Sequence, residues 1–338
     1  MGQKVDVSRQ TAEKTARSSD RNPYLFIVGC LRSGTTLLRR MVDAHPHLAI
    51  IHETQWVPRW FERRVGLTPE GFVTPELIPR LLDFPRFAEL RIFQRDLERL
   101  METGKPVPYS AFVSGVFDLY GEAQDKRLVG EKSPGYVRYL PTLHALWPET
   151  KFVHVIRDGR DVCASVLNWK KAGHNVGRHA TWAEDPVATA AFWWEWHVRL
   201  GREAGSSLGP NLYHEVRYEE LVSEPKETGE ALCSFLGLPY DEAIVSYQEH
   251  KETGSWGRAA KGRWLPPTPG MKERHSSMSV EEVERFEAAA GDLLDELGYP
   301  RAFPRPSRGA LERAREIRES FRRDVRDRGD RLLEVWKT

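Results

Sequence analysis

The sequence predicts an α/β fold with a central parallel sheet flanked by helices. Short apolar segments at 24–28 (YLFIV), 48–51 (LAII) and 152–156 (FVHVI) have the length and composition of buried strands. Segments with helical spacing of apolar residues alternate with them, and glycine-containing or charged turns follow the strands directly. Because ligands of such sheets bind beyond the carboxyl ends of the strands, we expect the chemistry just after residues 28, 51, 130, 156 and 216.

The remaining elements follow in order. A helix is expected from 35 to 45, a mainly helical stretch over 54–124, a strand at 128–130 and a helix over 136–147. A helix to about 169, a long aromatic helix over 186–204, a strand at 212–216 and helices to 237 come next. Residues 251–275 are rich in Gly, Pro, Lys and Arg and are expected to form a functional loop.

Three segments are expected. Residues 1–22 are polar and predict a flexible leader, and 23–300 form the main domain. Residues 301–338 predict an Arg-rich helical extension with an apolar seam, which needs either the body of the protein or a second subunit in a homodimer. The seam comprises Leu311, Ile317, Phe321, Val325, Leu332 and Trp336.

Charge and cysteine content exclude several classes. Lys plus Arg is 50 and Asp plus Glu is 49, a net charge of +1, so no global positive field favours nucleic acid or an anionic membrane. The three cysteines, Cys30, Cys163 and Cys233, form no CxxC pair, which argues against a disulfide framework and a zinc site. We expect a cytoplasmic protein without a secretory signal, a membrane span or a metal.

A glycine-containing loop follows the first strand. Gly29-x4-Gly34-Thr35-Thr36 between a strand and a helix has the frame of a phosphate-binding loop, in which backbone N–H groups surround an anion. Nucleotide hydrolases place Lys where Thr35 stands, whereas here the cation is Arg32. This departure argues against an ATP-dependent kinase. The alternative is an ordinary tight turn between strand and helix.

Residues 24–38 (YLFIVGCLRSGTTLL) resemble the 5′-phosphosulfate loop of sulfotransferases that use 3′-phosphoadenosine 5′-phosphosulfate (PAPS). The likeness continues through 39–46 to His52-Glu53-Thr54, where it is most similar to the tyrosylprotein sulfotransferase branch and its soluble bacterial relatives, and it covers roughly 24–265. It implies a P-loop-like sulfotransferase fold over 23–300. The residues that it implies for binding the phosphosulfate are Arg32, Ser33, Gly34, Thr35 and Thr36.

A second anion site is expected after residue 156. Arg157 leaves the strand end and Ser165 lies eight residues on, and a guanidinium with a hydroxyl suits a phosphate monoester. The segment resembles the 3′-phosphate motif of the family, which implies that Arg157 and Ser165 bind that phosphate, with Arg160 a further candidate. Alternatively, Arg157 forms a salt bridge with Asp158 or Asp161 at the helix start.

The resemblance also implies the transfer chemistry. In the tyrosylprotein branch the Glu at the position of Glu53 is the base, whereas cytosolic members use a His two residues after a Lys; here Pro134 stands there after Lys132. Lys132 resembles the family's Lys on the bridging oxygen, and Arg32 shares that role. The alternatives are His52 as base, Glu53 as a helix N-terminal charge and Lys132 as a surface residue.

The resemblance implies that Tyr218 contacts adenine, unless it only packs in the core. It also implies that Arg258 and Lys261 belong to a late basic loop over the 3′-phosphate. Several tryptophans predict either an acceptor pocket or core packing: Trp56, Trp60, Trp169, Trp182, Trp193, Trp194 and Trp196.

We therefore expect a PAPS-dependent sulfotransferase that gives adenosine 3′,5′-bisphosphate (PAP) and a sulfate ester. The acceptor is a hydroxyl, or an amine, of a small molecule, with a peptide tyrosine as the alternative. A P-loop kinase that uses ATP and a non-catalytic nucleotide-binding module are the rival hypotheses.

Overall fold

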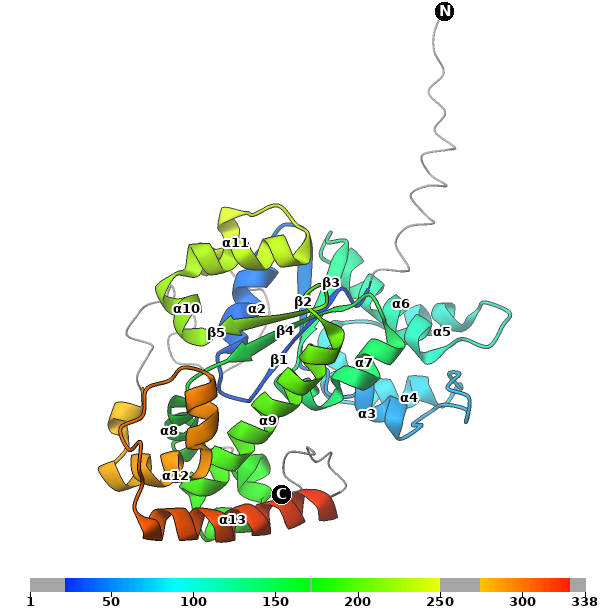
Figure 1. Cartoon of the computed structure of the whole chain (residues 1–338). Coiled ribbons are helices and arrows are strands. Elements are labelled where there is room, and N and C mark those ends of the chain that lie inside the picture. The colour runs from blue at the N-terminus through cyan, green and yellow to red at the C-terminus, as the bar shows by residue number, and fades with distance from the viewer. Residues whose placement is uncertain (1–21, 171, 250–273, 329–338) are drawn as a thin grey trace, which may run out of the picture.

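The computed structural model describes residues 22–170, 172–249 and 274–328 (Figure 1). Its helices and strands are β1 (Leu25–Gly29), α2 (Thr35–Asp43), β2 (Leu48–His52), α3 (Val57–Glu62), α4 (Leu77–Leu82), α5 (Gln94–Met101), α6 (Tyr109–Glu122), β3 (Leu128–Lys132), α7 (Leu140–Leu146), β4 (Lys151–Ile156), α8 (Gly159–Leu167), α9 (Pro186–Leu208), β5 (Tyr213–Arg217), α10 (Tyr218–Ser223), α11 (Pro225–Leu236), α12 (Val280–Glu296) and α13 (Arg308–Asp327).

The five strands form one parallel sheet in the order β2-β3-β1-β4-β5. The register sets His52 opposite Lys132 and Ile156 opposite Arg217 at the carboxyl ends. All five strand exits therefore lie along one edge of the sheet, where the sequence predicts the site.

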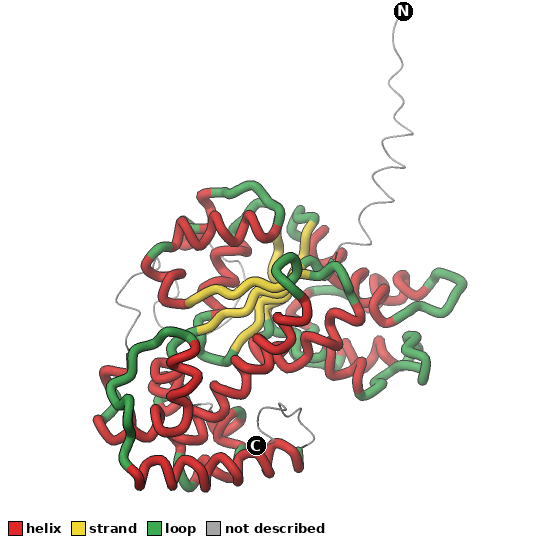
Figure 2. Tube along the Cα trace, in the orientation of Figure 1, coloured by secondary structure: helices red, strands yellow, loops and turns green. Residues whose placement is uncertain are grey.

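Both faces of the sheet are covered, as the strands enclosed by helices in Figure 2 show. Alternate residues of β1 enter different cores: Phe26 and Val28 pack with α3 to α7, while Leu25 and Ile27 pack with α2, α10 and α11. This is why these strands are apolar without interruption, as parallel strands buried on both faces require.

A third core lies beyond the carboxyl ends of β1 and β4, where Cys30 and Ile156 join side chains of α8, α9, α12 and α13. Part of the expected apolar seam enters this core, since Ile317, Phe321 and Val325 on α13 are buried there, whereas Leu311 is exposed. Leu332 and Trp336 lie outside the described residues. Helix α13 thus docks on the body of the same chain, across α9 and α12 (Figure 1).

Several boundaries differ from the sequence predictions. The single helix expected over 136–147 is a 3-10 turn (Pro134–Tyr139) followed by α7, because Pro141 sits at a helix start. Strand β3 extends to Lys132, and β5 is one residue later than expected. Asn22, assigned to the leader, is buried and donates to Asp118 at 2.7 Å, so it belongs to the packed body. Residues 1–21 lie outside the described residues.

Candidate active site

The loop between β1 and α2 is shaped by backbone conformations that favour glycine. Gly29 lies so close to β4 that a Cβ there would be 2.6 Å from the Val155 carbonyl oxygen. Gly34 has φ +96°, and a Cβ there would lie 2.2 Å from the Tyr218 ring. Arg32 also has a positive φ, 75°. The loop therefore turns back sharply and presents its residues at the N-terminus of α2.

Ser33 is the clearest indication that this loop holds an anion. Its side chain is fully buried, yet its hydroxyl oxygen has no hydrogen-bond partner within the described part of the chain. Buried polar atoms nearly always have a partner, so a ligand oxygen is the natural one here. The backbone N–H groups in the first turn of α2 also favour an anion at this loop, as those of a helix N-terminus do. These residues fit a phosphate or sulfate group.

Arg32 connects the loop to the second anion site. Its Nε donates to Ser165 Oγ at 2.9 Å, and its guanidinium lies over the Trp169 ring, 5.5 Å from the centroid. The Arg157 guanidinium in turn donates to the Arg32 carbonyl oxygen at 3.5 Å. The two anion sites predicted from separate segments are therefore contiguous.

Glu53 and Lys132 meet where β2 and β3 end. Lys132 is fully buried, so the alternative of a surface lysine is wrong. Its Nζ lies 2.5 Å from Glu53 Oε1 and 3.4 Å from Thr36 Oγ1 in the first turn of α2. A buried cation thus stands between a carboxylate and the anion loop. We call Arg32, Glu53 and Lys132, the residues to which the sequence analysis assigns the transfer chemistry, the transfer site.

Burial and neighbouring charges shift the pKa values of Glu53 and His52. Burial would raise the pKa of the Glu53 carboxyl, but Lys132 and neighbouring groups lower it to about 2. Burial, reinforced by Lys132, lowers the pKa of His52 to about 3, so its imidazole is neutral. A neutral His52 with Nε2 3.3 Å from Lys132 Nζ accepts a hydrogen bond and does not compete for the lysine as an anion does. Glu53 is therefore the ionised acceptor of this pair.

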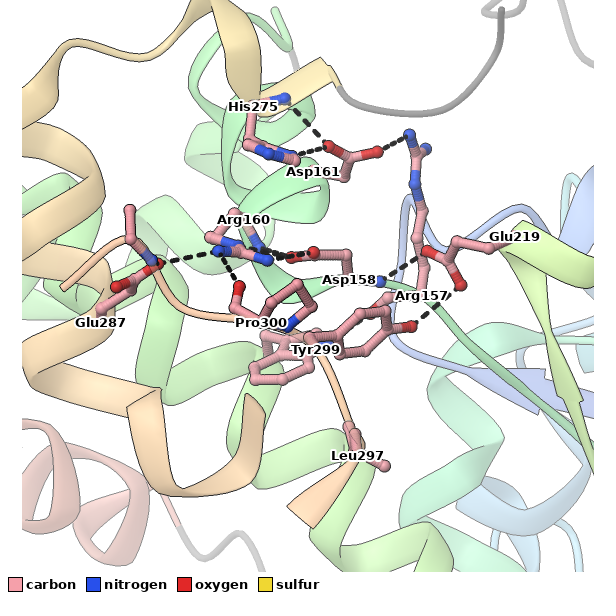
Figure 3. A network of polar contacts seen from close by, with 12 residues as sticks. Arg157, Asp158, Arg160, Asp161, Glu219, His275, Glu287, Leu297, Tyr299 and Pro300 are labelled. Atoms are coloured by element: carbon pink, nitrogen blue, oxygen red, sulfur yellow. Dashed lines mark hydrogen bonds and ion pairs between the residues drawn. The ribbon is translucent and has the colours of Figure 1, made fainter. Parts of the chain in front are cut away.

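Arg157 in the second anion site is held by a buried carboxylate. Its Nη2 lies 2.6 Å from Asp161 Oδ2, so the helix-start salt bridge does form, with Asp161. The backbone N–H and Nδ1 of His275 meet the other oxygen at 2.9 and 2.7 Å (Figure 3). The Arg157 guanidinium also lies over the Tyr218 ring, 4.3 Å from its centroid. Arg157 is thereby fixed between α8 and α10.

Arg160, a further candidate for the 3′-phosphate in the sequence analysis, is bound by groups of the protein itself. It donates to Asp158 Oδ2 at 2.7 Å, to Glu287 Oε1 at 2.8 Å and to the Pro300 carbonyl oxygen at 2.8 Å (Figure 3). These contacts join α8 to α12 and make Arg160 a structural link. Glu219 extends the network by accepting from the Asp158 N–H, 2.9 Å away.

The other predicted residues fall into three groups. Tyr218 is buried against Gly34 and Arg157, so it borders both anion sites. Arg258 and Lys261 lie outside the described residues. Among the tryptophans, Trp193, Trp194 and Trp196 are buried in the third core, which favours core packing over an acceptor pocket for these three.

The sequence predicts no part in binding or catalysis for two residues of the site, Arg86 and Asp161. Arg86 comes from the segment after α4 and lies 3.7 Å from Glu53 Oε2, and it donates to the Glu53 carbonyl oxygen at 3.3 Å. Only the tertiary structure brings 86 beside 53. Asp161 could have been found, because it lies four residues after Arg157 at helical spacing.

The described residues contain neither a candidate metal site nor a candidate membrane-spanning helix. Across 22–170, 172–249 and 274–328 there is no cluster of His, Cys, Asp and Glu suited to a metal ion. In the same part of the chain, no helix combines the length and the apolar character needed to cross a bilayer.

Comparison with known families agrees with this geometry. A model of the sulfotransferase family matches residues 23–242, well over half of the chain, and the chain belongs to that family. Among solved structures, the sulfotransferase domains of the curacin biosynthetic pathway and of the Synechococcus olefin synthase superpose with TM-scores of 0.57 and 0.56, each at 21% identity. Both cover 82% of this chain, and 98% and 95% of theirs. This likeness confirms the fold.

The similar curated proteins are protein-tyrosine sulfotransferases. Protein-tyrosine sulfotransferase 2 of Gallus gallus is 27% identical over 235 residues, which cover 69% of this chain and 56% of that protein. Protein-tyrosine sulfotransferase 1 of Danio rerio is 26% identical over 317 residues, 88% of this chain and 79% of that protein. This chain thus spans little more than half of the chicken protein.

Proposed function

We propose that this protein transfers the sulfuryl group of PAPS to an acceptor hydroxyl, or amine. The observation that carries the proposal is the buried Lys132, which reaches Thr36 in the first turn of α2 while pairing with Glu53. A cation beside an anion loop, with a carboxylate next to it, is the arrangement that sulfuryl transfer needs. Ser33, a buried hydroxyl with no partner across residues 22–170, 172–249 and 274–328, supports an anionic ligand there.

In this mechanism the donor's phosphosulfate binds along Arg32 to Thr36, and its 3′-phosphate binds Arg157 and Ser165. Glu53 takes the proton of the acceptor hydroxyl as the acceptor oxygen bonds to sulfur. The bond between sulfur and the bridging phosphate oxygen breaks, and its electron pair stays on PAP. Lys132 and Arg32 stabilise the negative charge that develops on that oxygen. No metal enters the scheme.

The ion pair between Lys132 and Glu53 bears on this scheme. A carboxylate with a pKa of about 2 is a weak base, and Lys132 is the neighbour that weakens it most. We propose that Lys132 turns toward the donor's bridging oxygen, which lets Glu53 accept a proton more readily. Sulfuryl transfer then needs the donor in place before the base becomes effective.

The acceptor is a separate part of the proposal. A small molecule with an apolar or aromatic alcohol is the acceptor class that we favour. The names of the similar curated proteins support a peptide tyrosine as the second candidate. For a cytoplasmic protein, which we also propose, either acceptor is accessible; the three cysteines are buried free thiols, as a reducing compartment allows.

The test is transfer of ³⁵S from labelled PAPS across a panel of alcohols, phenols, amines and tyrosine peptides. The variants Glu53→Ala and Lys132→Ala are expected to lower kcat by about 10²-fold or more with PAP still bound. Glu53 takes the proton of the acceptor, and Lys132 stabilises the charge that develops on the bridging oxygen during transfer. Glu296→Gln, an exposed carboxylate paired with Arg199 on the surface, is the control. Full turnover in both variants would remove the proposed roles.

The rival functions give other results. A P-loop kinase would turn over ATP with Mg²⁺ and have no affinity for PAP in calorimetry. A nucleotide-sensing module would bind PAP tightly and transfer label to nothing in the panel.

A further inference from the structure

A buried polar cluster lies beneath the transfer site, on the opposite face of β3. Successive residues of a strand point to opposite faces, so Glu131 faces away from its neighbour Lys132. The Glu131 side chain is fully buried. Its Oε1 accepts from the Thr54 N–H at 2.8 Å and from the Thr54 hydroxyl at 2.9 Å, and Ser133 Oγ also donates to it.

Thr54 lies between two strained residues. Glu53 has φ +47° and Gln55 has φ +63°, both in the left-handed region that residues other than glycine rarely adopt. Such conformations persist only where the surroundings hold them. The hydrogen bonds from Thr54 to Glu131 fix Thr54, which lies between Glu53 and Gln55. The Glu53 N–H also donates to the Lys132 carbonyl oxygen at 2.8 Å.

The cluster continues away from the site and anchors the turn on the next helix. The Thr54 hydroxyl lies 2.9 Å from Tyr136 Oη, which accepts from the Val57 N–H at 3.1 Å at the start of α3. Tyr109 Oη donates to the Val57 carbonyl oxygen at 2.8 Å. Glu131 is thus the anionic centre of a buried network that links the exits of β2 and β3 to α3 and α6.

We propose that Glu131 is a positioning residue of the transfer site, which holds the left-handed turn at Glu53 through Thr54 and so directs the Glu53 carboxylate toward Lys132 and the acceptor. The proposal rests on the function proposed above. It adds a role for a residue that touches neither the donor loop nor Lys132.

Ionisation of Glu131 provides a further readout. Burial raises the pKa of the Glu131 carboxyl to about 7, against the hydrogen bonds from Ser133 and Thr54, and Glu53 adds to the rise. The other titratable groups that sense its charge are Tyr109 and Tyr136, both neutral in this range. Above pH 7 the carboxylate accepts all its hydrogen bonds as an anion, and below pH 7 protonation weakens them.

The variants Glu131→Gln and Thr54→Val test the proposal, with ³⁵S transfer from PAPS as the assay. Each is expected to lower kcat by about 10-fold with PAP affinity within about twofold of the wild type, and the double variant is expected to lose no more than either single one. Thr54→Ser, which keeps the hydroxyl, is expected to retain more of kcat than Thr54→Val. Glu195→Gln, a buried carboxylate on α9 paired with Arg199 and Arg318, is the matched control.

Two measurements separate positioning from simple stabilisation. The wild-type kcat is expected to fall as the pH drops through about 7, whereas Glu131→Gln is expected to be flat there. Because ionised Glu131 costs stability above its ordinary pKa, Glu131→Gln is expected to unfold no more easily than the wild type at pH 8. Wild-type kcat and pH profile in Glu131→Gln would overturn the proposal, as would a loss of kcat that only follows a loss of stability.

A readout without turnover keeps this inference distinct from the proposed function. The carboxyl pKa of Glu53, measured by ¹³C NMR and assigned with Glu53→Gln, is expected to rise from about 2 toward its ordinary value in Thr54→Val and Glu131→Gln, because the carboxylate then moves off Lys132. An unchanged Glu53 pKa in both variants would overturn the positioning role even if transfer is observed. Absence of transfer by the wild type would remove the proposed function while this pKa still reports on the turn.

Discussion

The transfer site and the second anion site differ in how their cations are held. Lys132 is paired with the carboxylate of Glu53, a residue whose own backbone has a positive φ. In the same region, the Ser33 hydroxyl has no partner among the described residues. Arg157 is held between a buried carboxylate and an aromatic ring. Its neighbour Arg160 is linked to two carboxylates and a backbone carbonyl. Under the proposed mechanism, the transfer site changes its contacts during the reaction, whereas the second anion site keeps them.

The largest effect is expected where the two regions touch. Gly34 has a positive φ, and Gly34→Ala places a Cβ against the Tyr218 ring. The same ring lies under the Arg157 guanidinium, so a displaced Tyr218 would also disturb Arg157. We expect a loss of about 3 kcal/mol in the free energy of unfolding and no measurable PAP binding.

The measurements are urea unfolding and calorimetry with PAP. Gly237→Ala is the control, because Gly237 also has positive φ but no atom within 4 Å of an added Cβ. It is expected to cost about 1 kcal/mol and leave PAP binding intact. Equal losses in the two variants would mean that backbone strain, and not the contact with Tyr218, connects the regions.

A change at Arg157 separates binding from transfer. Arg157→Gln removes the guanidinium from the second anion site, and we expect PAP to bind about 30-fold more weakly, since hydrogen bonds between charged groups are among the strong ones. Lys132→Met is expected to lower kcat but to change the affinity for PAPS by less than about threefold, because the bridging oxygen that Lys132 stabilises gains its charge only during transfer. Calorimetry of each variant with PAP and with PAPS, without acceptor, decides between them, and the reverse order would invert the roles of the two regions.

The second anion site is expected to contribute to the pH dependence of stability. Burial opposes ionisation of Asp161, but His275 and Arg157 bring the pKa of its carboxyl well below the ordinary value. This stability is present above the unfolded pKa of about 3.9 and is lost as the pH falls below it. The hydrogen bond with Asp161 raises the pKa of His275, so its share is present below about pH 6.5 and is lost as the pH rises through the raised value.

Asp161→Asn should remove both pH-dependent contributions to stability, because the Asp161 carboxylate pairs with Arg157 and with His275. Urea unfolding between pH 3 and pH 9 is the measurement, with Glu296→Gln as a control that should preserve the wild-type profile. An unaltered profile in Asp161→Asn would show that the pair contributes nothing to the pH dependence.

The smallest effect is expected at Arg86. Its side chain is one-third exposed and lies 3.7 Å from Glu53 Oε2, whereas buried Lys132 lies at 2.5 Å from Oε1. Exposed ion pairs contribute little, so Arg86→Ala should change kcat by less than about threefold and leave PAP affinity unchanged. Arg80→Ala, an exposed arginine of α4, is the control. A drop of 100-fold for Arg86→Ala alone would move this arginine into the transfer machinery.

Much of this architecture could be predicted from local patterns. The apolar segments at 24–28, 48–51 and 152–156 became β1, β2 and β4 because strands buried on both faces must be apolar throughout. Glycine spacing around Arg32 predicted the tight loop, since the backbone there requires positive φ. Boundaries were less certain, as at 136–147, where a proline split the expected helix.

The contacts of the site could not be predicted in this way. Nothing local indicates that Arg86 reaches Glu53, that Glu131 holds Thr54, or that Arg160 is tied to Glu287, because these pairs are separated by 33, 77 and 127 residues.

The sequence by itself determined which segments become strands and helices, and which exits carry Arg32, Glu53, Lys132 and Arg157, because strand exits are fixed by local hydrophobicity and the parallel arrangement. The tertiary structure decided which of these groups pair, and how far their ionisation is altered. Lys132 is fully buried only because β2, β3 and α2 close around it, and its effect on the pKa of Glu53 depends on that burial and on a distance of 2.5 Å. Electrostatic interactions depend on distance and on exclusion of water, which packing alone sets.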